Sequence, residues 1–412
     1  MEIQVKVDRN WVAMSGKCRR FAELKLVAPK SEKESPPLSV AFVVDVSSSM
    51  RGRKIQQTIE ALKQAISHLR PCDWFSITVF NHRSSVLMES LKATEEHVRF
   101  AKKLIQTIEA QGNTNISAGW SSGFHTLVEK AEQKLVIVLS DGLTNAGMVE
   151  PSQLADMTRQ GIQKGVRTST FGIGEGFDEQ VLETMAHEGG GNFVFFADES
   201  RIPEIMESEI KECLAASVMN ARVQVVGPPG YDGKISFLGR YKSHRTRESL
   251  DVHLGSLISK QELKLYFEFE LDAIAPDDSN LFFVKVFGED ALLSEADVSF
   301  VGVSEVPEPP LLHEDVLVRS YKAKRNLVIL EATHLNSLHL YDEARRAIRE
   351  LARECLEAYT ETLSEGLGRV HEKLILDASR FGRSMSSVER KTSHSHVLYE
   401  ARSRGLFNRS SS

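Results

Sequence analysis

Two uninterrupted apolar runs, at residues 40–44 and 135–139, lie among segments with helical periodicity. Strands that helices cover on both faces of a parallel sheet have this composition. After the first run, residues 54–69 place apolar side chains three and four positions apart, which predicts an amphipathic helix. Because strand and helix segments keep alternating, residues 37–218 are predicted to form an α/β domain with a doubly wound, mostly parallel, Rossmann-like sheet.

The pattern changes after this domain. Short strand candidates, separated by turn sequences such as GPPGYDG, fill residues 219–308, and no helical segment interrupts them. This arrangement predicts an antiparallel β-sandwich. Residues 1–36 also contain alternating strand patterns but are too few to fold alone. We therefore expect residues 1–36 to complete the sandwich, with the α/β domain inserted between two of its strands.

Two further regions follow the sandwich. Residues 309–379 have helical periodicity, and the segment 343–357 gathers four apolar side chains on one face. We expect that face to pack against other helices or the sandwich, with a partner surface as the alternative. Residues 380–412 are rich in serine and hold seven basic residues against two acidic ones, which is typical of a basic, mobile tail.

Composition limits the function classes. The chain has 51 basic and 57 acidic residues, a net charge of −6 that gives no general attraction to nucleic acid. The charged N-terminus has no apolar signal segment, and no stretch approaches the ~20 apolar residues that cross a bilayer. The four cysteines lie far apart, which predicts reduced thiols. Together these features predict a cytoplasmic protein without a transmembrane segment.

Five side chains with oxygen donors lie at or near the carboxyl ends of predicted strands. Asp45, Ser47 and Ser49 alternate in the loop after the first apolar run, Thr114 lies in the sequence GNTNI, and Asp141 follows the second run. Doubly wound sheets place their ligands at this edge. Hydroxyl and carboxylate donors without cysteine or histidine favour Mg²⁺, Mn²⁺ or Ca²⁺. The sequence therefore predicts a divalent metal site.

The order of these pieces, DxSxS, then a threonine, then an aspartate after a later strand, resembles the metal-ion-dependent adhesion site of von Willebrand factor type A domains. The resemblance covers about residues 40–216. The wider layout is similar to bacterial proteins of this family and, more distantly, to inter-alpha-trypsin inhibitor heavy chains. The resemblance implies a binding module, not an enzyme.

In that family, two serines coordinate the metal directly, and the threonine does so in the ligand-competent state. The aspartates act largely through water and by orienting hydroxyls. By position, these roles fall on Ser47 and Ser49, on Thr114, and on Asp45 and Asp141. A partner's Asp or Glu carboxylate completes the shell of the ion.

The resemblance also implies a kind of partner. Intracellular members of the family often act as adaptors or recruit substrates for larger machines, including AAA+ ATPases of the MoxR type. The expected function is therefore an intracellular adaptor or scaffold that binds a protein presenting an acidic residue. An AAA+ ATPase complex or its substrate is one such partner.

Two other functions stay open. A metal-assisted hydrolase could use the same site, although no His or Glu occurs in the three loops that carry it. The sequence GWSSG at residues 119–123 matches the GxSxG nucleophile elbow, but it falls within a predicted helix instead of a strand–turn–helix. Alternatively, the basic tail at residues 380–412 could make the chain an RNA-binding scaffold.

Overall fold

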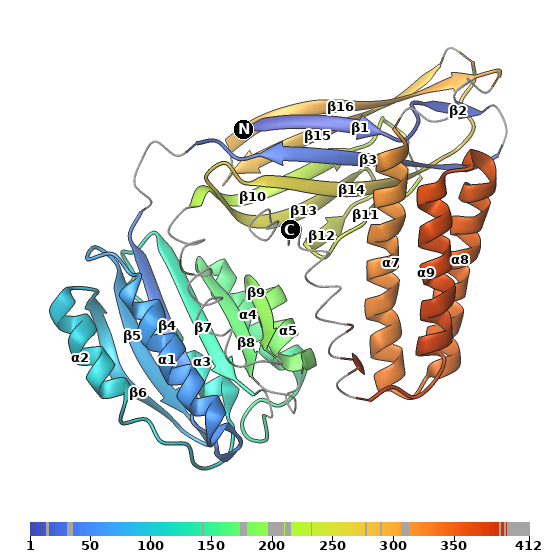
Figure 1. Ribbon diagram of the computed structural model, residues 1–412. Coiled ribbons are helices and arrows are strands. Elements are labelled where there is room, and N and C mark those ends of the chain that lie inside the picture. The colour runs from blue at the N-terminus through green and yellow to red at the C-terminus, as the bar shows by residue number, and fades with distance from the viewer. Residues whose placement is uncertain are drawn as a thin grey trace, which may run out of the picture. The chain divides into compact units, whose positions relative to one another are not determined.

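The computed structural model contains two compact units, Met1–Lys30 with Ser217–Ser412, and Ser31–Ala216 (Figure 1). The structure describes residues 1–13, 16–30, 36–141, 144–173, 179–196, 210, 216–231, 233–276, 278–288, 291–305, 313–386, 389–390 and 393.

The α/β unit is built on a six-stranded sheet. In spatial order its strands are β6 (Ser84–Lys92), β5 (Trp74–Phe80), β4 (Leu38–Asp45), β7 (Gln133–Ser140), β8 (Val166–Ile173) and β9 (Gly190–Phe196). All neighbours pair in parallel except β6, which is antiparallel to β5. Every residue of the central strand β4 is buried, as its apolar run requires. The predicted doubly wound, mostly parallel sheet is confirmed.

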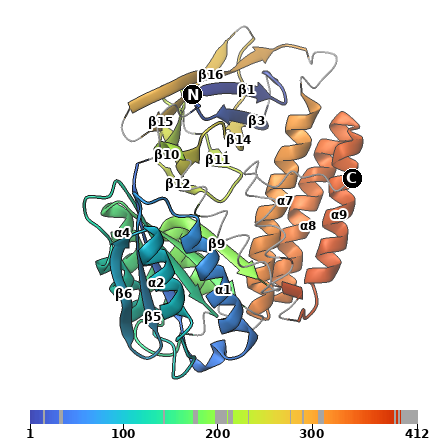
Figure 2. The same cartoon turned by 60° about the vertical axis from the view of Figure 1, so that its left-hand side comes forward.

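Helices cover both faces of this sheet (Figures 1 and 2). They are α1 (Arg53–Ser67), α2 (Glu95–Ile105), α3 (Ile116–His125), α4 (Pro151–Gln163) and α5 (Glu179–Glu188), preceded by the short 3₁₀ turn η1 (Ser48–Met50). Successive strand side chains point to opposite faces. Phe42 of β4 therefore joins the core with α1 and α2, whereas its neighbour Val43 faces α3.

The second unit contains a β-sandwich. Its four-stranded sheet has the order β1 (Glu2–Val7), β3 (Cys18–Val27), β14 (Glu262–Leu271) and β11 (Ile235–Phe237). Its six-stranded sheet has the order β12 (Lys242–Arg245), β13 (Ser249–Ile258), β10 (Ala216–Val226), β15 (Ser279–Gly288), β16 (Ala291–Val303) and β2 (Trp11–Ala13).

The N-terminal strands complete this sandwich. Strand β3 lies between β1 and β14, so that Leu24 is opposite both Val5 and Leu265 in antiparallel register. Side chains from both sheets, including Phe269, Phe282 and Phe300, form one buried core between them. The expected insertion of the α/β unit between strands of a sandwich is confirmed.

Three helices pack on the outer face of the four-stranded sheet: α7 (Glu314–Ser337), α8 (Tyr341–Thr362) and α9 (Glu365–Phe381). Phe21 of β3 contacts Tyr321 of α7, with ring centroids 5.5 Å apart. Glu23, two residues further along β3, accepts hydrogen bonds from Tyr266 at 2.8 Å and Arg319 at 3.0 Å. The apolar face of α8 is buried in the same core, which confirms the packing interpretation; its residues are Ala344, Ile348, Leu351 and Cys355.

Some predicted segments lie outside the residues that the structure describes. Residues 197–215, near the end of the predicted α/β domain, lie outside the described residues except for Ile210, and β10 begins at Ala216. Residues 394–412 of the expected tail also lie outside them. Cys18, Cys72 and Cys355 are free thiols, and Cys213 is not among the described residues. None of the described helices has the length and apolar character needed to cross a membrane.

Asp8 is a buried carboxyl group of the sandwich. Its Oδ1 accepts a hydrogen bond from the Phe21 N–H at 2.7 Å. Burial raises the pKa of Asp8 to about 6, and this effect outweighs the Phe21 hydrogen bond and the charges of Arg20 and Arg9. The folded protein therefore holds the Asp8 proton at a pH where the unfolded chain has released it.

We expect Asp8→Asn to change how stability depends on pH. Because the pKa is raised on folding, the stability from Asp8 is present below pH 4 and is lost as pH rises through about 6. The free energy of unfolding of Asp8→Asn relative to wild type should therefore rise by about 2–3 kcal/mol between pH 4 and 7. Urea unfolding at a series of pH values measures this difference, and Asp272→Asn, at an exposed position, is the control. A difference in the free energy of unfolding that does not change with pH would contradict the prediction.

Candidate metal centre

Hydrogen bonds join the loops that follow β4 and precede α3. The Val46 N–H donates to the Phe80 carbonyl at 2.8 Å, and the Val46 carbonyl accepts from the Gln111 N–H at 2.5 Å. The Ser48 N–H donates to the Gly112 carbonyl at 2.9 Å. These bonds fix the loop of Ser47 and Ser49 beside the loop of Thr114, at the carboxyl edge of the sheet where ligands bind in such folds.

Asp45 ends β4 and is fully buried. Its Oδ1 accepts from the Ser47 N–H at 2.7 Å, and its Oδ2 accepts from the Ser140 hydroxyl of the neighbouring strand β7 at 2.5 Å. Burial raises the pKa of Asp45 to about 6, although the Ser140 and Ser47 hydrogen bonds oppose the shift; the charge of Asp141 raises the pKa further. Asp45 thus orients the Ser47 loop and lies within the electrostatic reach of a second carboxylate.

The two serine hydroxyls lie together. The Oγ atoms of Ser47 and Ser49 are 3.0 Å apart. Ser47 is buried, whereas Ser49 is exposed. The pair therefore connects the buried carboxylates with the protein surface, where an external ligand can reach it.

Hydrogen bonds to residues 145–146 fix both the N–H and the carbonyl group of Thr114. Its N–H donates to the Asn145 side-chain oxygen at 2.9 Å, and its carbonyl accepts from the Asn145 and Ala146 N–H groups at 3.0 and 3.1 Å. Within the described part of the chain, the Thr114 hydroxyl has no hydrogen-bond partner. The next residue, Asn115, caps α3 by accepting from the Ala118 N–H at 3.0 Å. The backbone is fixed while the hydroxyl stays available.

Asp141 directly follows β7 and is fully buried. Its Oδ2 accepts from the Lys54 ammonium at 3.0 Å. Its Oδ1 is buried and has no hydrogen-bond partner among the described residues. A buried acceptor without a partner is costly, so this oxygen calls for an explanation such as a bound ion or water.

These residues fit a hard divalent ion. All five donors are oxygens, three of them neutral hydroxyls, and the unpartnered Asp141 Oδ1 is a negatively charged acceptor inside the sheet edge. No group of three or more His, Cys, Asp or Glu side chains suited to a metal occurs in the described ranges. A metal held by these described residues would have hydroxyl and carboxylate oxygens as ligands, which suit Mg²⁺ or Mn²⁺ better than Zn²⁺.

Sequence reasoning missed four residues around the site: Lys54, Ser140, Asn145 and His82. His82 is exposed, and its Nδ1 lies 3.1 Å from the position that a Cβ on Gly112 would occupy. This histidine borders the Thr114 loop, so the hydrolase alternative stays open. Lys54 could have been suspected, because the first turn of the helix that follows DxSxS carries two cations, Arg53 and Lys54.

Residues 39–208 match the family model of the von Willebrand factor type A domain. This segment is a von Willebrand factor type A domain. The inter-alpha-trypsin inhibitor heavy chain H3 of Mesocricetus auratus is 32% identical over 164 residues, which are 38% of this chain and 18% of the heavy chain. YfbK of Escherichia coli (strain K12) is 23% identical over 257 residues, which are 60% of this chain and 44% of YfbK. The chain thus spans less than a fifth of the heavy chain and under half of YfbK.

Two solved structures share the fold over most of the chain. A von Willebrand factor type A protein from Catenulispora acidiphila has a TM-score of 0.68 at 18% identity and covers 87% of both chains. The ArnB paralog VWA2 from Sulfolobus acidocaldarius has a TM-score of 0.57 at 16% identity and covers 97% of both chains. At these identities the likeness concerns the fold alone.

The GWSSG sequence of this von Willebrand A domain lies within α3 and forms no nucleophile elbow. Its two glycines face the sheet instead. A Cβ on Gly119 would lie 2.5 Å from the Phe80 ring, and one on Gly123 would lie 2.3 Å from Val43 Cγ2. The glycines therefore allow α3 to approach the sheet closely, and the prediction that the motif falls within a helix is confirmed.

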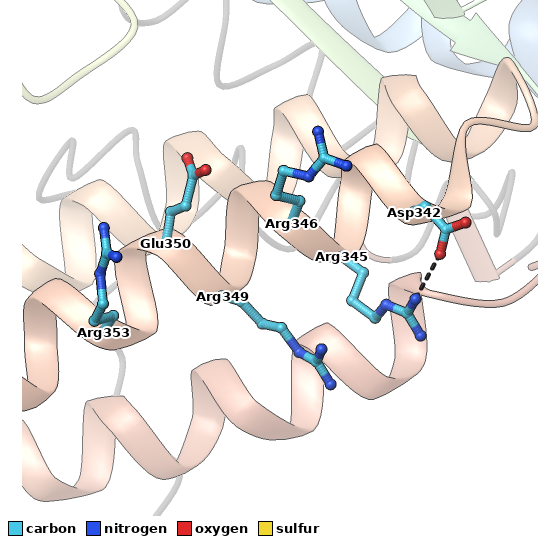
Figure 3. Close-up of a pocket in the computed structure, with 6 residues that line it drawn as sticks. All are labelled: Asp342, Arg345, Arg346, Arg349, Glu350 and Arg353. Carbon is cyan, nitrogen blue, oxygen red and sulfur yellow. Dashed lines mark hydrogen bonds and ion pairs between the residues drawn. The ribbon is translucent and has the colours of Figure 1, made fainter.

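Outside the von Willebrand A domain, α8 carries a basic surface (Figure 3). A hollow of about 500 Å³ is lined by Asp342, Arg345, Arg346, Arg349, Glu350 and Arg353. Asp342 pairs with Arg345 at 2.5 Å. All six lining residues belong to the side of α8 opposite its buried apolar face, so the described lining comes from one helix only. We interpret it as a solvated charged face.

Proposed function

We propose that the von Willebrand A domain binds a divalent ion, Mg²⁺ in preference to Mn²⁺ or Ca²⁺, and through it a carboxylate of a protein partner. The observation that carries the proposal is the buried Oδ1 of Asp141, which has no partner among the described residues. It belongs to an edge of the sheet that also gathers Asp45 and the adjoining hydroxyls of Ser47 and Ser49.

Each residue has a separate task in this proposal. Ser47, Ser49 and Thr114 offer neutral hydroxyls, while Asp45 orients the Ser47 loop and Asp141 supplies negative charge. When bound, the ion supplies a positive charge that attracts an acidic side chain. Because the hydroxyl ligands do not neutralise this charge, the site favours an anionic partner. The exposed Ser49 marks the side from which that partner approaches.

The wider role that we propose is that of an intracellular adaptor or scaffold, not an enzyme. An α/β domain with a single carboxylate-capturing site suits recruitment of a protein, and the sandwich and the helices that pack on it offer further surface. Whether the retained partner is an AAA+ ATPase complex or its substrate is an outcome of the experiment below.

An affinity pull-down from native extract tests the proposal with a matched pair of serine variants. Ser48 and Ser49 are adjacent and exposed, but only Ser49 has its hydroxyl beside that of Ser47. We expect Ser48→Ala to retain the partner in Mg²⁺. Ser49→Ala should reduce its retention at least about tenfold, as should EDTA with wild type. Mass spectrometry identifies the partner; partners that are indifferent to both EDTA and Ser49→Ala would contradict the proposed function.

A further inference from the structure

Lys54 lies in the first turn of α1 and reaches back to the candidate metal centre. Gly52 precedes the helix with φ of 82°, a conformation that other residues rarely adopt, and so allows the sharp turn after the DxSxS loop. The Lys54 ammonium donates to Asp141 Oδ2 at 3.0 Å. Its side chain is 23% exposed, whereas that of Asp141 is fully buried. The ammonium is therefore at the border between the buried carboxylate and solvent.

The ion pair leaves the Asp141 carboxylate only half satisfied. Lys54 occupies Oδ2, while Oδ1 has no partner in the described part of the chain. A lysine ammonium is a compact point charge on a flexible stem, so it can pair with a carboxylate and also withdraw toward water. An ammonium that can leave Asp141 in this way is suited to alternate with a second cation at the same carboxylate. A permanent structural ion pair would not need this freedom.

The Lys54 ammonium changes the net charge of the candidate metal centre. With Asp45 and Asp141 ionised, the two carboxylates and the Lys54 ammonium leave one net negative charge. A divalent ion in the same place changes the net charge to one positive. Without the lysine, the corresponding charges are two negative and zero. The ammonium therefore weakens the attraction of the site for a cation and strengthens the attraction of the loaded site for an anion.

We propose that Lys54 is a built-in competitor of the divalent ion: it neutralises Asp141 when the ion is absent and lowers the affinity of the site for it. The proposal rests on the proposed function, because it concerns the same site. It explains how a buried carboxylate pair is stable without metal. It also makes ion binding depend on the partner, since an acidic ligand favours the loaded, positively charged state.

Titration with Mn²⁺, followed by the electron paramagnetic resonance signal of the free ion, tests the proposal on the full chain. We expect Lys54→Met to bind Mn²⁺ about tenfold more tightly than wild type. Lys63→Met is the matched control, because Lys63 lies on the same helix but pairs with the exposed Glu60 at 2.7 Å. Its affinity should equal that of wild type. Lys54→Gln serves as the second neutral variant if Lys54→Met folds poorly.

Thermal unfolding distinguishes competition between Lys54 and the divalent ion from a purely structural role of Lys54. In EDTA, Lys54→Met should melt below wild type, because it leaves Asp141 unpaired. In saturating Mn²⁺ the difference should close, since the ion replaces the ammonium. A lowering of the melting temperature that is equal in EDTA and in Mn²⁺ would overturn the proposal.

The affinities distinguish the two proposals. Equal or weaker Mn²⁺ binding by Lys54→Met, with measurable binding by wild type, would overturn the competitor role and leave the proposed function standing. Mn²⁺ binding by Lys54→Met alone would support the competitor role most strongly. No Mn²⁺ binding by any of the proteins would overturn the proposed function, and the competitor role with it.

Discussion

Affinity for Mn²⁺ should fall about 10- to 100-fold when Asp45 is replaced by asparagine, because a charged group that orients a metal ligand is lost. Asp45 supplies one of the two negative charges of the site and fixes the Ser47 loop through the 2.7 Å hydrogen bond to its N–H. Asparagine keeps an oxygen for that bond but removes the charge. The same titration that tests Lys54 measures the loss.

The fold should survive this substitution. The Ser140 hydroxyl, which donates to Asp45 Oδ2 at 2.5 Å, can instead accept from the asparagine NH₂. Burial disfavours the ionised carboxyl group of Asp45, as its raised pKa indicates, so the melting temperature in EDTA should stay equal or rise. Asp156→Asn, on the exposed surface of α4, is the control. Wild-type Mn²⁺ affinity in Asp45→Asn would contradict the assignment of Asp45 to the site.

Replacing Gly123 by leucine should destabilise the α/β unit by about 3 kcal/mol or more, because overpacking a tight core forces both backbones to move. The first added carbon would lie 2.3 Å from Val43 Cγ2 and 3.5 Å from the Ala41 Cβ. Val43 and Ala41 belong to the fully buried strand β4, which is packed too tightly to move away from the added side chain. The better helix propensity of leucine, about 1 kcal/mol relative to glycine, offsets only part of this cost.

Urea unfolding followed by circular dichroism measures this effect. Ser121→Ala, in the same GWSSG sequence, is the control and should change the free energy of unfolding by less than about 0.5 kcal/mol. Unchanged stability of Gly123→Leu would show that α3 does not depend on the glycine for its approach to the sheet.

The sequence predicts the central strands well because burial on both faces leaves an unmistakable apolar run, as in β4. Edge strands leave a weaker signal. Strand β6 spans Ser84–Lys92, and because nearly all of its residues are exposed or partly exposed, it has no long apolar run. Strand β12, Lys242–Arg245, is exposed at every position and was not anticipated. Their backbone pairing depends on a neighbouring strand, which local composition does not reveal.

The sequence suggests the five candidate positions because each follows a recognisable strand or lies in a recognisable loop. It does not suggest their supporting contacts. The Lys54–Asp141 pair joins residues 87 positions apart, and Asn145 supports Thr114 from 31 positions away. Such pairs arise from the order of strands in the sheet, so their identity needs three-dimensional coordinates.

The place of β3 in the sandwich affects the timing of synthesis. Its second neighbour, β14, begins at Glu262, and the register joins Val27 to that residue. At a translation rate of about 5–20 residues per second, the ribosome takes roughly ten to fifty seconds to pass from one to the other. The whole segment Ser31–Ala216 emerges in that interval. During synthesis, the edge of β3 that later pairs with β14 therefore stays unpaired while the α/β unit emerges, and an unpaired strand edge can pair with other chains.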